Sequence, residues 1–183
     1  FSDTTWGDWR SRMTLSEQSD RSRTEDNGFF GSIDSFRTRA TVLSWVNNLV
    51  LGSQWLATAG LERQSQRADT TTTSTFGSPY NVSRHTTALF GGVEGPVAGG
   101  TVQLNARHDR VGDLSKTTGY LGYSFPVTEQ IKLIASTSTA FNAPPLGYLY
   151  APGFGNPNLK PEQARSHELG AQFGSGAHLL RAT

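Results

Sequence analysis

Cysteine is absent from this 183-residue chain, and its absence excludes several kinds of site. Without a thiol there is no disulfide framework, no thiolate metal site and no cysteine nucleophile. The chain opens with "FSDTTWGDWRS". It therefore lacks an initiating methionine and the pattern of basic, apolar and small residues that marks a signal peptide. Its last residues, "HLLRAT", lie within an alternating run. We therefore expect an internal segment of a longer protein.

Long hydrophobic runs are missing as well. The most apolar neighbourhood, "TVLSWVNNLVLG", is interrupted by Ser44, Asn47 and Asn48, whereas a membrane-spanning helix needs roughly 20 consecutive apolar residues. Hydrophobic residues make up 35% of the chain and its mean hydropathy is -0.43. These values exclude a transmembrane helix but not a transmembrane β-barrel, whose strands turn only alternate residues towards lipid.

Net charge is small. The 16 basic and 15 acidic residues leave a formal charge of +1 and are spread along the chain. Nucleic-acid-binding proteins concentrate basic residues on one face or in one stretch. We expect no nucleic-acid partner.

Alternation of polar and apolar residues is the dominant pattern, and it predicts β-strands rather than helices. In "TVQLNARHD", for example, Val102, Leu104 and Ala106 alternate with polar residues. About nine segments show this period: 8–18, 43–51, 54–63, 86–95, 101–109, 119–125, 131–141, 167–173 and a last one that begins at 177. The sequence therefore predicts an all-β, antiparallel fold.

The connections between these segments alternate between short and long. Short turns are predicted at 51–54, 94–100, 126–130 and 174–177. Longer polar loops are predicted at roughly 17–35, 64–83 and 142–164, with a modest one near 109–116. Outer-membrane barrels have this arrangement, with short periplasmic turns and longer extracellular loops. A soluble antiparallel sandwich also has short alternating strands, and it remains an alternative on the pattern alone.

The stretch "TAFNAPPLGYLYAPGFGNPNLKPEQARSHELG" (139–170) carries a more specific signal. It resembles the barrel of TonB-dependent outer-membrane receptors, in which an aromatic–x–Ala–Pro turn is followed by a Gly-Asn-Pro-x-Leu-Lys-Pro-Glu segment and a strand with Glu-Leu-Gly. The matching residues here are Phe141, Ala143, Pro144, Gly155, Asn156, Pro157, Leu159, Lys160, Pro161, Glu162, Glu168, Leu169 and Gly170. Within the family, "LYAPGFGNPNLKPE", "DWRSRMTL" and "LSWVNNLVLG" are similar to the cobalamin (vitamin B12) receptor branch.

The resemblance implies a transmembrane barrel of about 22 strands closed around a plug. Residues 1–183 would form part of that barrel domain, with the plug and the C-terminal strands outside the chain. The implied function is uptake of a large, scarce nutrient across the bacterial outer membrane, with cobalamin as the first ligand and an iron-chelating siderophore as the alternative. The implied partners are outer-membrane lipid, the small-molecule ligand, and TonB through the missing N-terminal region. A monomeric barrel is expected.

The physical character of the motif explains why a loop interrupts the strands. Its prolines fix φ and remove N–H donors, so 144–161 cannot extend the sheet. We expect "NPNLKPE" to mark the return into the next strand. The aromatic residues Tyr148, Tyr150 and Phe154 are the candidate ligand contacts, although they could instead form the small core of the loop or an interfacial girdle.

No catalytic site, bound cofactor or metal site is predicted. His108, Asp109 and Asp113 provide too few oxygen ligands for calcium, and we expect them in a solvated loop. Calcium in the intact receptor is implied only by the resemblance. Polar residues of the opposite strand face would line a wet lumen: Arg107, Lys132, Glu168 and Gln172.

Three other functions remain open on the residues alone. A small, complete outer-membrane barrel could serve as an adhesin, a pore or an anchor. An outer-membrane hydrolase would need His85 or His108 paired with a serine, and a soluble sandwich could bind carbohydrate. The sequence contains no G-x-S-x-G turn to support the hydrolase, so we expect that the protein is not an enzyme.

Overall fold

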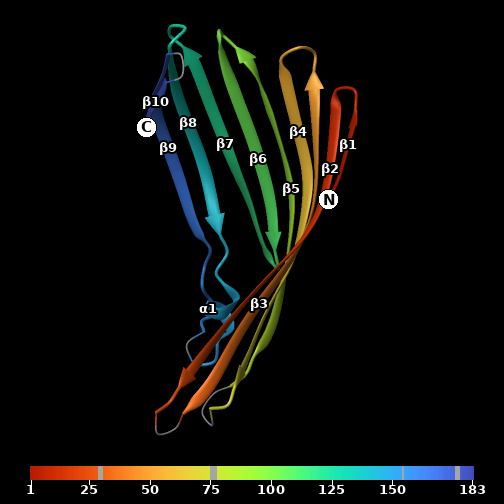
Figure 1. The fold of residues 1–183 in the computed structure, drawn as a ribbon, viewed down its shortest axis with the longest axis vertical. Helices are drawn as coiled ribbons and strands as arrows, with labels where there is room; N and C mark the ends of the chain where they lie inside the picture. Colours follow the sequence, from red (N-terminus) through yellow and green to blue (C-terminus); the bar gives the residue numbers. More distant parts are fainter. Residues whose placement is uncertain (29–30, 75–77, 154, 176–177) are drawn as a thin grey trace.

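The computed structural model describes residues 1–28, 31–74, 78–153, 155–175 and 178–183. These residues form one curved antiparallel sheet whose strands pair in sequence order (Figure 1). The strands are β1 (Ser2–Trp6), β2 (Trp9–Asp26), β3 (Ser32–Leu51), β4 (Trp55–Thr72), β5 (Asn81–Val97), β6 (Gly100–Val111), β7 (Leu114–Pro126), β8 (Ile131–Asn142), β9 (Glu162–Ser175) and β10 (His178–Ala182), and the helix is α1 (Leu146–Tyr150). Since all the described strands share one sheet, the two-sheet sandwich is wrong.

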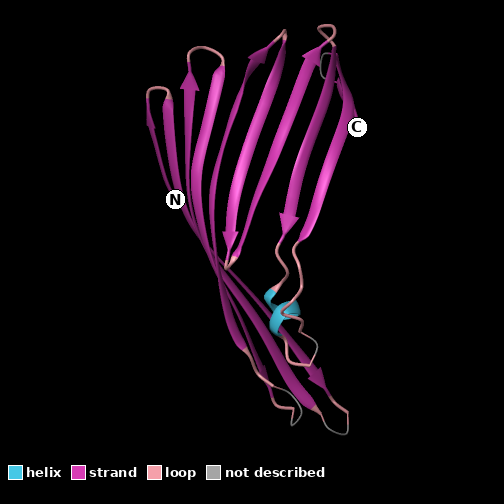
Figure 2. Cartoon of the chain, turned by 180° about the vertical axis from the view of Figure 1, so that it is seen from behind, coloured by secondary structure: helices cyan, strands magenta, loops and turns pink. Residues whose placement is uncertain are grey.

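Short connections close five of the strand pairs at one end of the sheet, the upper end in Figure 1. The β5–β6 turn shows why they can be so short. Ala98 and Gly99 have φ values of 48° and 79°, and two successive residues with positive φ match the right-handed twist of a hairpin. The longer connections lie at the opposite end, where α1 is found (Figure 2). The prediction of a long loop is confirmed for the connection between β8 and β9, and a shorter one of eight residues joins β4 and β5. The connection between β2 and β3 has five residues, about as many as the four of the β7–β8 turn, so the predicted contrast is wrong there.

The strands are longer and more numerous than the alternating pattern predicts. The described residues form ten strands instead of about nine, because the alternating pattern does not predict β1. Much of the predicted loops 17–35 and 64–83 belongs to β2, β3, β4 and β5, and the predicted loop 109–116 is a tight turn between Val111 and Leu114. In these regions both strand faces are polar, so the alternation disappears while the backbone hydrogen-bond ladder continues.

The strand register separates an apolar face from a polar face. Directly opposed residues share a face, and one row crosses six strands: Trp9, Leu49, Ala57, Val93, Leu104 and Leu121. Large apolar side chains on this outer face are exposed, including Leu169 at 79% and Leu104 at 51%. An exposed apolar surface of this extent is typical of contact with lipid. Within the described residues, no helix is long and apolar enough to cross a membrane.

The opposite, inner face holds the polar half of each strand. Lys132 lies opposite Gln172, and Glu168 lies opposite Ser136, so the register places these residues on one face as the sequence predicts. Few apolar residues are buried among the described ones, and they are mostly small: Ala68, Ala88, Val111, Leu146 and Ala151. The backbone ladder and the contact of α1 with β5 hold the structure together.

Candidate functional site

The loop between β8 and β9 folds over the inner face at the long-loop end of the sheet. Its helix α1 begins after Pro145, and Leu146, which is 4% exposed, anchors it. The guanidinium of Arg84 on β5 donates a hydrogen bond from Nη1 to the carbonyl oxygen of Pro144 at 2.6 Å and one from Nη2 to Oε1 of Gln66 at 2.8 Å. The side chain of Arg84 therefore fixes the start of the loop to the inner face of the sheet.

A cavity of about 650 Å³ lies between this loop and the extended ends of β2, β3 and β4. The lining combines hydroxyl groups with aromatic and small apolar groups: Ser22, Thr24, Asp34, Ser35, Phe36, Thr70, Thr71, Thr72, Ser78, Tyr80, Gly147, Tyr148, Ala151, Pro152 and Gly153. Burial raises the pKa of the Tyr80 hydroxyl, which therefore stays a neutral hydrogen-bonding group at physiological pH. Such a mixture of apolar surface and a few polar groups is common in small-molecule sites.

The three predicted ligand contacts have different positions. Tyr148 lines the cavity and is 63% exposed. Tyr150 is 47% exposed. Phe154 lies outside the described residues. All three assignments stay predictions.

The motif residues after the cavity shape the return into β9. The carbonyl of Ala151 accepts a hydrogen bond from the amide of Gly155 at 2.7 Å, and a Cβ at Gly155 would lie 2.6 Å from that carbonyl oxygen. Only glycine fits there. Oδ1 of Asn156 accepts a hydrogen bond from the amide of Asn158 at 3.0 Å, which forms an Asx-turn. Pro157, Leu159, Lys160 and Pro161 then lead to Glu162, the first residue of β9.

The other motif residues belong to the strands. Phe141 lies opposite Gln163 near the end of β8, and Ala143 and Pro144 follow that strand. Leu169 points to the apolar outer face, and Glu168 points to the inner face. A Cβ at Gly170 would lie 2.8 Å from the carbonyl oxygen of Ala182 on β10, so this position favours glycine for close strand packing.

An ion-pair network crosses the inner face in the middle of the sheet. Arg107 donates from Nη2 to Oε1 of Glu62 at 2.7 Å and from Nε to both carboxylate oxygens of Asp109 at 3.0 Å. Its guanidinium also lies 5.5 Å from the ring centroid of Phe90. Asp109 is 6% exposed, so the expectation that it lies in a solvated loop is wrong. The residue is on β6 and faces inward, because the strand continues to Val111.

His108, its neighbour, points to the outer face. Its Nδ1 lies 2.8 Å from Oγ1 of Thr117. Neighbouring strand residues face opposite sides of a sheet, so His108 and Asp109 cannot bind one metal ion together. Among the described residues, no group of three or more His, Asp and Glu side chains is close enough to hold a metal ion.

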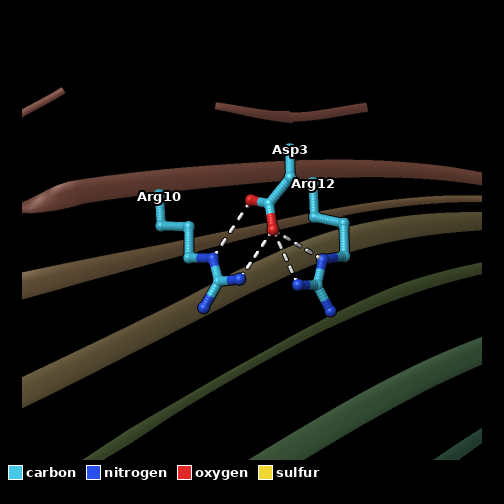
Figure 3. Close-up of polar contacts among 3 residues, drawn as sticks. All are labelled: Asp3, Arg10 and Arg12. Carbon is cyan, nitrogen blue, oxygen red and sulfur yellow. Dashed lines mark hydrogen bonds and ion pairs between the residues drawn. The ribbon is translucent and has the colours of Figure 1, made fainter. Parts of the chain in front are cut away.

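A second inner-face cluster lies near the short-turn end, on β1 and β2. Figure 3 shows the carboxylate of Asp3 between two guanidinium groups. Arg10 donates to Oδ1 at 3.0 Å and Oδ2 at 2.6 Å, and Arg12 donates from Nη2 to Oδ2 at 2.7 Å. The alternating pattern does not predict this cluster, because it does not predict β1. The alternation of Arg10 and Arg12 with Ser11 was the only available signal for it.

Known proteins are similar to this chain along most or all of its length. Residues 1–183 match the family model described as "TonB dependent receptor-like, beta-barrel". The chain is 28% identical to the vitamin B12 transporter BtuB of Photobacterium profundum over 171 residues, which cover 93% of this chain and 27% of the transporter.

Two solved structures have a similar fold. A mutant of the ferric enterobactin receptor PfeA from Pseudomonas aeruginosa has a TM-score of 0.83 at 19% identity, covering 97% of this chain and 32% of the receptor. The ferric yersiniabactin uptake receptor FyuA from Yersinia pestis has a TM-score of 0.72 at 15% identity, covering 98% and 33%. The chain thus spans about a quarter to a third of the proteins that it resembles.

Proposed function

The chain belongs to the β-barrel family of TonB-dependent receptors, which are outer-membrane proteins, and on this premise we propose that it is part of a receptor that imports cobalamin. The observation that carries the choice of ligand is the sequence similarity to a vitamin B12 transporter along 93% of the chain. In this proposal TonB drives transport by acting on a segment outside residues 1–183, and the described sheet supplies one part of the barrel wall.

The cavity at the long-loop end is the proposed entry point for the ligand. Long loops of outer-membrane barrels lie on the extracellular side, so a ligand arriving from outside meets Tyr148 and Tyr150 first. Aromatic side chains offer a large, rigid apolar surface that suits a macrocyclic ligand, while the hydroxyl groups of Tyr80 and the threonines offer hydrogen bonds. Calcium in the intact receptor stays a prediction.

A ferric siderophore is the second candidate ligand. The segment Leu159–Glu162 resembles siderophore receptors as well as the cobalamin branch, so the motif alone does not choose between them. Both ligands are large, and both suit the same mode of import.

Uptake by cells that lack their own cobalamin and siderophore receptors tests the proposal. The full-length receptor that contains this chain is expected to support TonB-dependent uptake of radiolabelled cyanocobalamin. Tyr148→Ala is expected to weaken binding about 5–30-fold, because a central aromatic contact commonly contributes about 1–2 kcal/mol. Leu169→Ala, on the lipid-facing side, serves as a control with unchanged binding.

Two outcomes would contradict the cobalamin proposal. Uptake of a ferric siderophore without uptake of cyanocobalamin would transfer the assignment to the second ligand. Uptake that continues in a strain without TonB would show that the protein is not an active importer.

A further inference from the structure

A group of arginines on the outer face has no role in ligand import from the lumen. Arg37 and Arg39 on β3 continue the outer-face series that includes Leu43, since residues two apart share a strand face. Arg21 on β2 lies directly opposite Arg37, and Arg67 on β4 lies directly opposite Arg39. These four residues, Arg21, Arg37, Arg39 and Arg67, are here called the arginine patch.

Two directly opposed pairs of arginines are unfavourable without an anion between them. Like charges directly opposite one another on neighbouring strands destabilise a sheet. Asp69 lies opposite Arg37, yet within the described residues no ion pair or side-chain hydrogen bond involves Arg37, Arg39 or Arg67. Among the residues that the structure describes, the one side-chain acceptor for Arg21 is the neutral hydroxyl of Ser35, at 3.3 Å. Glu17 and Glu25 are other outer-face carboxylates near the patch, and they lie opposite Thr41 and Ile33. Glu25 pairs with Arg23, at 3.8 Å.

The patch also surrounds a hollow in the outer surface. Arg37, Arg39 and Arg67 line it together with Asp69, Pro79 and Tyr80, and its volume is about 480 Å³. Nε of Arg37 is buried and has no hydrogen-bond partner. A buried donor without a partner is costly. The three arginines give the hollow the positive charge to attract an anion.

The position of the patch indicates where that anion comes from. Leu15 and Leu43 form the last pair of large apolar residues on the outer face of β2 and β3. Arg39 follows four residues further on, which is roughly 13 Å along the strand, or about 10 Å along the membrane normal at the usual tilt of about 40°. The headgroup layer on each side of a bilayer is about 5–8 Å thick, and arginine side chains can bend back towards it.

We propose that the arginine patch binds the phosphate groups of glycolipid headgroups in the outer leaflet of the outer membrane. The arginine side chains are on the lipid-facing side rather than the lumen side, and those of Arg39 and Arg67 can bend back to headgroup depth. They are at the long-loop end, which is extracellular in outer-membrane barrels. Guanidinium groups bind phosphate oxygens through paired, charge-assisted hydrogen bonds. A lipid phosphate between the opposed arginines removes their mutual repulsion.

Lipid titration of the detergent-solubilised, full-length receptor tests this proposal, with native mass spectrometry as the readout. The probes are diphosphoryl lipid A and a neutral glycolipid with the same acyl chains. The Arg39→Ser/Arg67→Ser variant is expected to bind diphosphoryl lipid A about 30-fold more weakly, at roughly fivefold for each arginine near an anionic lipid surface. The charge-matched control is Arg110→Ser/Arg165→Ser, because these arginines lie opposite Thr87 and Thr139 rather than opposite another arginine.

The outcomes are distinct. A loss confined to the patch variant and to the phosphorylated lipid supports the proposal. Equal losses in the two variants would show that the effect comes from overall charge and would overturn the proposal, as would equal affinity for the two lipids.

Thermal unfolding in a neutral detergent gives a second readout. Without lipid the patch variant should be at least as stable as the parent, and a less stable patch variant would show that the arginines stabilise the sheet by themselves.

Discussion

At the scale of single residues, charge on the inner face is organised around arginine. Arg107 reaches across β5 to Glu62, which is in the same row as Asp109; the β5 residue between these two carboxylates, Ala88, is small and buried and leaves room for the guanidinium. The planar guanidinium can contact two carboxylates and the Phe90 ring at once, which a lysine ammonium cannot do. The network joins three neighbouring strands through side chains as well as through the backbone.

Replacing Arg107 with methionine is expected to destabilise the barrel. The Asp109 carboxylate, whose side chain is 8% exposed, would lose its cationic partner while staying buried. Breaking a fully buried pair costs about 3–5 kcal/mol, and partial exposure of Arg107 lowers the expected loss in the free energy of unfolding to about 1–3 kcal/mol. Urea unfolding of the full-length receptor in detergent micelles measures it.

Lys132→Met is the matched control for this prediction. It also removes one inner-face cation, but Lys132 has no ion pair with the described residues and is exposed. Indistinguishable unfolding free energies for the two variants would contradict a stabilising role of the network. Adding Asp109→Asn to Arg107→Met should restore part of the loss, since the unpaired charge is then removed.

At the scale of elements, the loop between β8 and β9 depends on the strand wall beside it. Its sequence fixes local features, such as the turn at Asn156 and the glycine at position 155. The direction in which the loop folds depends on Arg84, which is 60 residues away in sequence from Pro144. Nothing in the alternating pattern of β5 distinguishes Arg84 from other inward polar residues.

Arg84→Ala is therefore expected to loosen residues 143–161 without unfolding the barrel. Hydrogen bonds from a charged donor contribute about 1.5–3 kcal/mol each, so local opening should increase by roughly tenfold or more. Chymotrypsin cleavage of the loop in intact cells, at the tyrosines of α1, measures the change. Arg63→Ala serves as control, since Arg63 lies on the outer face and has no side-chain partner among the described residues. A cleavage rate like that of the parent receptor would contradict the anchoring role.

At the scale of the whole molecule, the described sheet is open. β1 pairs only with β2, and β10 pairs only with β9. Unpaired strand edges offer rows of free N–H and C=O groups that can pair with another chain. In a closed barrel the neighbouring strands cover these edges.

Residues 1–183 produced alone are therefore expected to associate through their edges when refolded into detergent micelles. Analytical ultracentrifugation should show several copies of the chain per particle or larger aggregates. Co-refolding with the remainder of the receptor should return a single heat-modifiable barrel. A stable monomer with full β-sheet content from residues 1–183 alone would show that the open edges are tolerated.

The sequence by itself determined the strands that carry the apolar belt, the short turns near 51–54, 94–100 and 126–130, and the motif residues around Asn156 and Pro157. Each of these is local, because period-two alternation, proline and glycine act within a few residues. The tertiary structure alone decided the pairing of Arg107 with Glu62 and Asp109, the anchoring of the loop by Arg84, and the opposition of Arg39 and Arg67. These contacts depend on strand register, which brings together residues that are distant in sequence. The same reason explains the underestimated strand lengths: beyond the membrane both faces are polar, and only the ladder of a neighbouring strand reveals that the sheet continues.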